Sequence, residues 1–209
     1  MLTAGRGWQR LRVRSLLRRL ARHGVRTAVF EGDTWQTAAA RYVIHPGPGG
    51  ALRLAKLEKQ GKLKAVGTQN IDGLHQAAGS KTVYELHGST LRNYCTRCGA
   101  FYDVDYIANS PGVPRCEKCG GIVTPDVVLY EEGLDEEVLS GAVNAIRHAD
   151  TLIIGGTSLV VYPAAGLIRY FRGDHLVVIN MQPTGADAQA DLCIAKPIGQ
   201  VLSEDVVLE

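Results

Sequence analysis

Residues 151–158 have the sequence TLIIGGTS, a short apolar run that ends in two glycines and two hydroxyl side chains. An apolar run of this length, without polar alternation, is typical of a strand that is covered on both faces. A second run of the same kind, LVVI at 176–179, follows it along the chain. The two runs therefore predict strands of a parallel sheet that has helices on both sides.

Outward from these runs, strands and helices alternate through most of the chain. A turn-rich stretch at 87–126 interrupts the alternation. This order predicts an α/β fold with a doubly wound, Rossmann-like parallel sheet and one small inserted lobe at about 88–126. The sequence patterns predict strands at 64–68, 82–86, 127–130, 151–155, 176–179 and 191–194, and helices at 51–60, 71–78, 135–148, 163–171 and from 198 onward.

The inserted stretch holds two close pairs of cysteines, Cys95-x₂-Cys98 and Cys116-x₂-Cys119, with 17 residues between the pairs. Each pair forms a turn that directs two thiolates at one point, and two such turns complete a tetrahedral site. Because all four ligands come from the protein, we predict one structural zinc ion per chain. Four unrelated core cysteines would be the alternative, and the spacing argues against it. The fifth cysteine, Cys193, lies in an apolar run and is expected to be a small core residue.

The first fifty residues have a different composition from the rest. Residues 1–53 hold ten Arg, no Lys and two acidic residues, whereas all seven Lys lie at or beyond Lys56. A basic arm for nucleic acid is one interpretation, but no aromatic or glycine pattern of a nucleic-acid-binding module accompanies the arginines. The cluster HPGPGG at 45–50 marks the start of the regular pattern. We therefore separate an atypical Arg-rich segment, 1–50, from a domain at 51–209; within the segment, 8–23 could form a basic helix.

Composition excludes some classes of protein. The chain has 209 residues, of which 45% are hydrophobic and 21% charged, the balance of a globular chain with a sizeable core. No apolar run approaches the ~20 residues of a membrane span, and a secretory signal is not expected. Paired cysteines without an export signal indicate metal binding in a reducing compartment. We therefore expect a cytoplasmic protein with no membrane partner.

Polar side chains follow several predicted strands. TQNIDGLH at 68–75, the pair His87-Gly88, GGTS at 155–158 and Asn180 each come where a strand ends. The carboxyl ends of parallel strands share the crevice in which such sheets bind ligands. A histidine there is a candidate general base, and hydroxyl or amide groups can hold a ribose or a phosphate.

Two of these signals have structural alternatives. Asn70 could cap the helix that follows it, with Asp72 favouring the helix dipole. A lone histidine is more often structural, and His23, His75 and His148 are expected to be so because each lies in a helical stretch.

In combination the motifs are specific. TQNIDGLH, the His-Gly pair, the double CxxC, PDVVLYEE at 125–132, GTSLVVYPA at 156–164 and VIN at 178–180 occur in this order. From about residue 51 to the C-terminus, the chain resembles the sirtuins, the NAD-dependent protein deacylases. The resemblance implies that NAD and an acyl-lysine-bearing protein or peptide react to give free lysine, nicotinamide and O-acyl-ADP-ribose.

The resemblance also implies roles for individual residues. His87 would be the base acting on the ribose hydroxyls, while Asn70 and Asp72 would position the nicotinamide ring and a water molecule. Val127, Val128 and Tyr162 would hold the peptide. The expected contacts to NAD are Gln69, Asn70, Ile71, Asp72, Gly156, Thr157, Ser158, Asn180, Met181, Gln182 and Ile198.

One part of the family pattern is absent. Sirtuins open with a strand, a GAGxS glycine loop and a PDFR segment, and residues 1–50 contain neither motif. We expect the first strand of the sheet and its phosphate-binding loop to be missing or replaced, so that the sheet is N-terminally incomplete and the activity impaired. A non-catalytic zinc-bearing sirtuin relative and a zinc-ribbon nucleic-acid binder remain the alternative functions.

Overall fold

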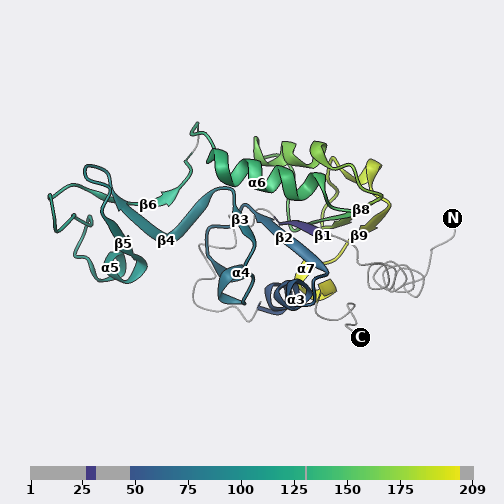
Figure 1. Ribbon diagram of the computed structural model, residues 1–209, viewed down its shortest axis with the longest axis horizontal. Helices are drawn as coiled ribbons and strands as arrows, with labels where there is room; N and C mark the ends of the chain where they lie inside the picture. The colour runs from purple at the N-terminus through teal and green to yellow at the C-terminus, as the bar shows by residue number, and fades with distance from the viewer. Residues whose placement is uncertain (1–26, 32–47, 130, 203–209) are drawn as a thin grey trace.

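A six-stranded sheet forms the centre of the molecule (Figure 1), and every neighbouring pair of strands in it is parallel. The computed structural model describes residues 27–31, 48–129 and 131–202. The strand order is β3-β2-β1-β7-β8-β9. The predicted Rossmann-like parallel sheet is thus confirmed. Its strands are β1 (Thr27–Glu31), β2 (Leu63–Thr68), β3 (Val83–Glu85), β7 (Thr151–Gly155), β8 (His175–Ile179) and β9 (Leu192–Ile194).

The sheet is not missing its first strand, which corrects the expectation of an N-terminally incomplete sheet. β1 lies between β2 and β7, with Thr27 opposite both Leu63 and Thr151. It comes from the segment 1–50 that the sequence analysis set apart from the domain at 51–209. The composition of that segment hid the strand, because TAVFE is short and stands in an arginine-rich context. The helix predicted at 8–23 lies outside the described residues.

Side chains alternate between the two faces of the sheet, and each face has its own core. On β7, Ile153 packs into the cluster that includes Leu54 of α3 (Pro48–Lys59), and α7 (Ile198–Gln200) contacts the same helix. Leu152 and Ile154 pack into the cluster of α6 (Glu136–Arg147) and the 3₁₀ helix η1 (Ala164–Tyr170). Figure 1 shows α3, α4 and α7 on one side of the sheet and α6 on the other. The helices cover both faces, as the apolar strands predict.

The helices differ from the predicted ranges mainly at their ends. α3 begins at Pro48, inside the HPGPGG cluster, because proline is tolerated in the first turn of a helix. The helix expected at 71–78 is only α4 (Leu74–Ala77), since Gly73 before it has a left-handed backbone with φ of 68°. The helix expected at 163–171 is the 3₁₀ helix η1, and a second short 3₁₀ helix, η2, spans Asp187–Gln189.

The inserted lobe is a separate three-stranded antiparallel sheet at the far end of β4 (Figure 1). β4 (Gly88–Cys95) pairs with β5 (Phe101–Asp103) on one side and β6 (Val123–Val127) on the other, and α5 (Val104–Asn109) follows β5. The lobe's small core consists of Cys95, Tyr102, Cys116 and Val123. So few apolar residues need a further crosslink to hold the lobe together.

Within the described parts of the chain, none of the helices combines the length and the apolar character that crossing a membrane requires.

Candidate active site and metal centre

The loops after β2 and β7 meet at the carboxyl edge of the sheet. The Thr157 hydroxyl donates to Gln69 Oε1 at 3.5 Å, although the two residues are 88 positions apart in the sequence. Both side chains are buried. The structure therefore brings the TQNIDGLH and GGTS motifs together, as expected for parallel strands that end at one edge.

His87 lies at the same edge, two residues after the end of β3, and is also buried. Its backbone carbonyl accepts a hydrogen bond of 3.0 Å from the Val128 amide, and Gly88 pairs with Val127. The predicted base thus sits beside the end of β6, where the predicted peptide contacts Val127 and Val128 lie in and just after the strand. Val127 and Val128 are half-buried, and Tyr162, the third, is exposed.

The loop between β2 and α4 is organised by short-range hydrogen bonds. The Asn70 amide donates to Thr68 Oγ1 at 3.0 Å, and the Leu74 amide donates to Asp72 Oδ1 at 3.0 Å. The N-cap of α4 is Gly73 and has no side-chain cap, so the interpretation that Asn70 caps this helix is wrong. Asp72 instead closes a short turn with the Leu74 amide. Asn70, Ile71 and Asp72 are half-buried, so they remain accessible beside Gln69.

The predicted adenosine contacts lie after β7 and β8. Gly156 has a left-handed backbone, with φ of 62°, and its amide donates to the Ile179 carbonyl at 3.1 Å. The Asn180 side chain donates to the Gln182 carbonyl at 2.8 Å, which fixes the turn after β8. Ser158, Met181 and Gln182 are exposed, while Ile198 is partly buried and packs on the core below the end of β7.

The four paired cysteines converge as predicted. Their Sγ atoms all lie within 4.8 Å of one another, with Cys95 and Cys119 at 3.4 Å and Cys98 and Cys116 at 3.5 Å. A tetrahedral site with Zn–S bonds of about 2.3 Å places its sulfurs roughly 3.8 Å apart. The cluster therefore fits a structural zinc ion that is held by four protein ligands.

The surroundings of the sulfurs favour a cation. The Tyr102 hydroxyl donates to Cys116 Sγ at 3.2 Å and lowers the pKa of this thiol to about 6. The Gly121 amide lowers the pKa of Cys119, but hydrogen bonds with Cys98 and Cys95 and burial outweigh it and raise the pKa to about 12. The negative charge on one sulfur thus makes it unfavourable to deprotonate the next thiol. A bound dication would compensate that charge and allow all the thiols to ionise.

One contact in the metal lobe and the exposure of one cysteine in the main sheet do not follow from the sequence pattern. Tyr102 contacts Cys116 from β5, and no spacing rule links it to the cysteine pairs. Cys193 is exposed rather than a core residue, because β9 forms the edge of the sheet.

Of the histidines expected to be structural, His75 is buried, His148 is exposed with its ring against the Asn144 carbonyl, and His23 lies outside the described residues.

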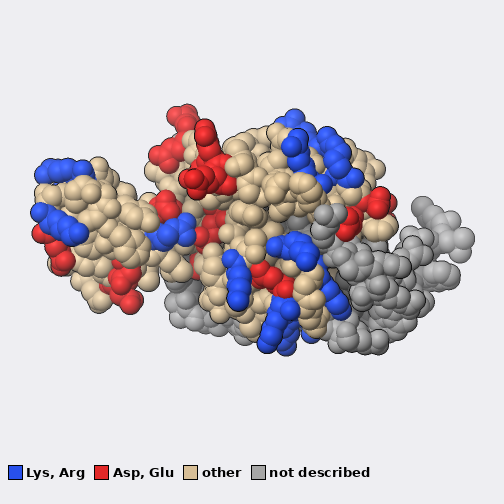
Figure 2. All heavy atoms as spheres, in the orientation of Figure 1, with Lys and Arg blue, Asp and Glu red and all other residues tan. Residues whose placement is uncertain are grey.

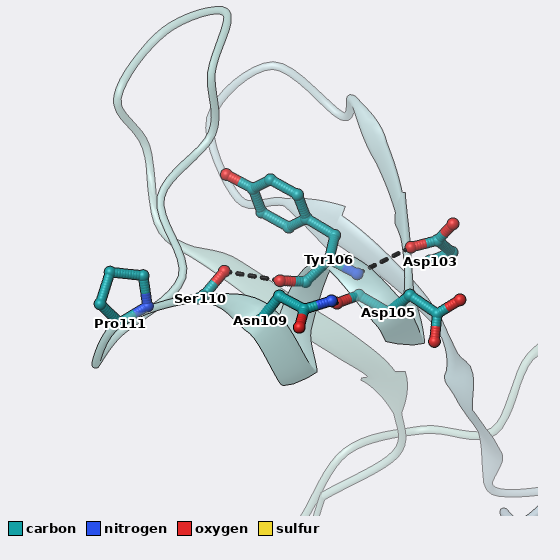
Figure 3. A pocket seen from close by; sticks show the side chains of 6 residues that line it. All are labelled: Asp103, Asp105, Tyr106, Asn109, Ser110 and Pro111. Atoms are coloured by element: carbon teal, nitrogen blue, oxygen red, sulfur yellow. Dashed lines mark hydrogen bonds between the residues drawn. The ribbon is translucent and has the colours of Figure 1, made fainter.

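A hollow of about 470 Å³ lies on the lobe and is lined by residues of α5 and its two ends (Figure 3). Its polar groups serve the fold of the lobe. Asp103 caps α5 by accepting from the Tyr106 amide at 2.8 Å, and the Ser110 hydroxyl donates to the Tyr106 carbonyl at 2.7 Å. The Asn109 side chain donates to the Asp105 carbonyl at 2.8 Å. The polar groups that line the hollow are thus engaged in hydrogen bonds of α5, and none of them belongs to the candidate active site.

The surface of the lobe carries both signs of charge (Figure 2). The stretch from Cys95 to Cys119 contains equal numbers of basic and acidic residues. The basic ones are Arg97, Arg115 and Lys118, and the acidic ones are Asp103, Asp105 and Glu117. A zinc ribbon that binds nucleic acid presents a basic face. The lobe gives no support to that alternative.

The sequence is similar to those of known NAD-dependent protein deacetylases. The chain is 68% identical over 154 residues to an NAD-dependent protein deacetylase of Clostridium perfringens, a match that covers 73% of this chain and 63% of the relative. It is 54% identical over 165 residues to the protein of the same name from Cutibacterium acnes, covering 78% of this chain and 67% of the relative. The chain thus spans less than two thirds of the Clostridium protein.

Solved structures give the same result. A Sir2 structure with a p53 peptide and NAD⁺ is 32% identical, covers 90% of this chain and 94% of its own, and has a TM-score of 0.76. A Sir2 structure bound to a propionylated peptide is 31% identical, covers 91% and 95%, and has a TM-score of 0.78. The sequence model of the Sir2 family matches residues 8–163, so the match begins well before residue 51, where the sequence motifs begin. The chain therefore belongs to the Sir2 family.

Proposed function

We propose that the chain is an NAD-dependent protein-lysine deacylase that releases nicotinamide and O-acyl-ADP-ribose. The observation that carries the proposal is the meeting of three loops at one sheet edge: the Gln69 loop, His87 and the Thr157 loop. The name NAD-dependent protein deacetylase, borne by relatives up to 68% identical, supports it.

Separate groups of residues at this edge would contact the two halves of NAD. Asn70, Ile71 and Asp72 would surround the nicotinamide end of NAD beside Gln69, and His87 would take a proton from a ribose hydroxyl. Gly156, Thr157 and Ser158 would hold the adenosine half together with Asn180, Met181, Gln182 and Ile198. When bound, NAD would supply the ribose carbon that accepts the acyl oxygen.

The peptide would lie along β6, next to His87. Val127, the last residue of this strand, and Val128, which follows it, are half-buried, and the Val128 amide is bonded to the His87 carbonyl. A peptide there would place its acyl-lysine near the histidine. Tyr162 would cover the peptide from the loop before η1. We further infer a cytoplasmic location, because thiolate zinc ligands persist in a reducing compartment.

A nicotinamide-release assay with the full chain, NAD and an acetyl-lysine peptide tests the proposal. His87→Ala should remove turnover, since the base would be lost. His148→Ala is the matched control, because that histidine is exposed and bonds only locally to Asn144. Turnover that survives in His87→Ala would contradict the assigned role.

A non-catalytic relative that retains only the zinc lobe and weak ligand binding is the second candidate. It is favoured by the absence of GAGxS and PDFR from residues 1–50, since backbone amides of a glycine loop commonly bind the pyrophosphate. Weak NAD binding by calorimetry together with no nicotinamide release would support this candidate. Micromolar NAD binding with sustained, His87-dependent turnover would exclude it.

A further inference from the structure

β4 is interrupted by a bulge just after it leaves the candidate active site. Ser89 pairs with Asp126 and Asn93 pairs with Pro125, so the three residues Thr90, Leu91 and Arg92 have no counterpart on β6. A bulge turns side chains out of the regular ladder towards other parts of the molecule. We call Thr90–Arg92 the β4 bulge.

One side of the β4 bulge holds the loop after β2. The amide and the hydroxyl of Thr90 both donate to the Ile71 carbonyl, at 3.0 and 3.1 Å. Leu91 covers Gly73 so closely that a Cβ on this glycine would lie 2.5 Å from Leu91 Cδ1. The buried Asn93 side chain donates to the Thr90 carbonyl at 3.2 Å and fixes the bulge itself.

Arg92 connects the two strands on the other side. Its NH1 donates to Glu85 Oε2 at 2.7 Å, and its Nε donates to Asp126 Oδ2 at 2.8 Å. Glu85 ends β3 two residues before His87, and Asp126 directly precedes Val127 on β6. A single guanidinium therefore joins the strand that leads to the histidine and the strand that would carry the peptide.

The two ion pairs differ in burial. The Glu85 side chain is 7% exposed, whereas Asp126 is 45% exposed and Arg92 40%. A buried carboxylate requires a partner, and the planar fork of arginine can serve two carboxylates at once, which a lysine ammonium does less well. The Glu85 pair anchors Arg92, and the Asp126 pair restrains β6.

We propose that Arg92 is a positioning residue, which holds β6 in register against His87 and thereby sets the affinity for the acyl-lysine peptide. It acts through Asp126 and Glu85 and does not itself touch the ligand. The affinity part rests on the proposed function; the restraint on β6 does not.

The test combines peptide binding with amide exchange in the full chain. A fluorescein-labelled acetyl-lysine peptide gives the Kd by anisotropy, and NMR hydrogen exchange follows the Val128 amide, which is bonded to the His87 carbonyl. The variants are Arg92→Met, Arg92→Lys, Asp126→Ala and the double variant Arg92→Met/Asp126→Ala. Asp105→Ala is the control, because it removes an exposed acid from the same lobe.

Arg92→Met and Asp126→Ala should each raise the peptide Kd by about tenfold and speed exchange at Val128. The double variant should bind the peptide no more weakly than the weaker of the two single variants, because both single variants already remove the Arg92–Asp126 ion pair. Arg92→Lys should restore thermal stability by pairing with Glu85 but leave the peptide Kd raised, which a purely structural role would not do.

Unchanged Val128 exchange in Arg92→Met would overturn the proposal, as would additive effects in the double variant. Wild-type peptide affinity in Arg92→Lys would also overturn it. A wild-type chain that binds no acetyl-lysine peptide would refute the proposed function and the affinity part with it. Exchange at Val128 would still decide whether Arg92 holds β6.

Discussion

Gly88 and Asp126 are in direct backbone contact: a Cβ on Gly88 would lie 1.9 Å from the Asp126 carbonyl oxygen. Gly88 also has a φ of 76°, a conformation that side chains disfavour. The contact brings β4 against β6 directly after His87. Glycine at this position therefore permits the pairing of β4 with β6, the strand along which the peptide would lie.

Replacement of this glycine should be strongly destabilising. We expect Gly88→Ala to lower the free energy of unfolding by about 3 kcal/mol or more, because the backbone of β6 cannot yield as a flexible side chain can. Gly112→Ala is the control, since Gly112 has a φ of 81° but nothing within 4 Å of its would-be Cβ. It should cost only about 1 kcal/mol in a urea titration. Equal losses would show that the carbonyl contact is unimportant.

The four-cysteine cluster predicts how many zinc ions each chain binds. We expect about one zinc per chain by elemental analysis, and Cys116→Ser should lose the metal and unfold the lobe, because too few apolar residues remain to hold it. Cys193→Ser should retain the zinc, as Cys193 is exposed and belongs to the edge strand β9. A folded lobe without zinc would refute the structural role of the metal.

The Tyr102 hydroxyl should increase the affinity of the four-cysteine cluster for zinc. Loss of this hydroxyl in Tyr102→Phe should raise the pKa of Cys116 and weaken zinc binding by about tenfold. A metal competes with protons for the thiolate, so the difference from wild type should grow as the pH falls from about 9 towards 6.

Competition with a zinc chelator at several pH values measures this effect. Tyr94→Phe is the control, because Tyr94 lies on the exposed face of the same small sheet, against Phe101. Identical zinc affinities for Tyr102→Phe and wild type at pH 6 would contradict the assigned hydrogen bond.

Asp135 should stabilise α6 as its N-cap. Its carboxylate accepts from the Val138 amide at 2.9 Å, so Asp135→Ala should cost about 1 kcal/mol in urea unfolding. Asp135→Asn keeps the acceptor and should cost much less. If both variants lose the same stability, the negative charge at the helix dipole, and not the cap, would be the cause.

The elements that could be predicted from the sequence are those whose own residues determine their structure. β7 has the predicted bounds, because five consecutive residues of TLIIG are buried and nothing polar interrupts them. The four-sulfur cluster follows from its spacing alone. β1 was missed because a five-residue strand gains its identity from its neighbours β2 and β7 rather than from its own composition.

The contacts that organise the site were harder to predict. Arg92 and Glu85 are seven residues apart on different strands, and they meet only because a bulge turns Arg92 towards β3. No periodicity encodes such a bulge. The polar loops at the sheet edge were located by the general rule for parallel sheets. The late start of α4 was not, because it depends on the left-handed turn at Gly73 and on the bond between Asp72 and the Leu74 amide.

The central place of β1 has a consequence for biosynthesis. Among the described strands of the main sheet, β1 leaves the ribosome before the others. Its partner on one side begins at Leu63, and its partner on the other side begins only at Thr151. At typical elongation rates, completing the second edge takes on the order of ten seconds after the strand appears. During that interval one edge of β1 would have no native partner, and an unpaired strand edge is a template for pairing with another chain.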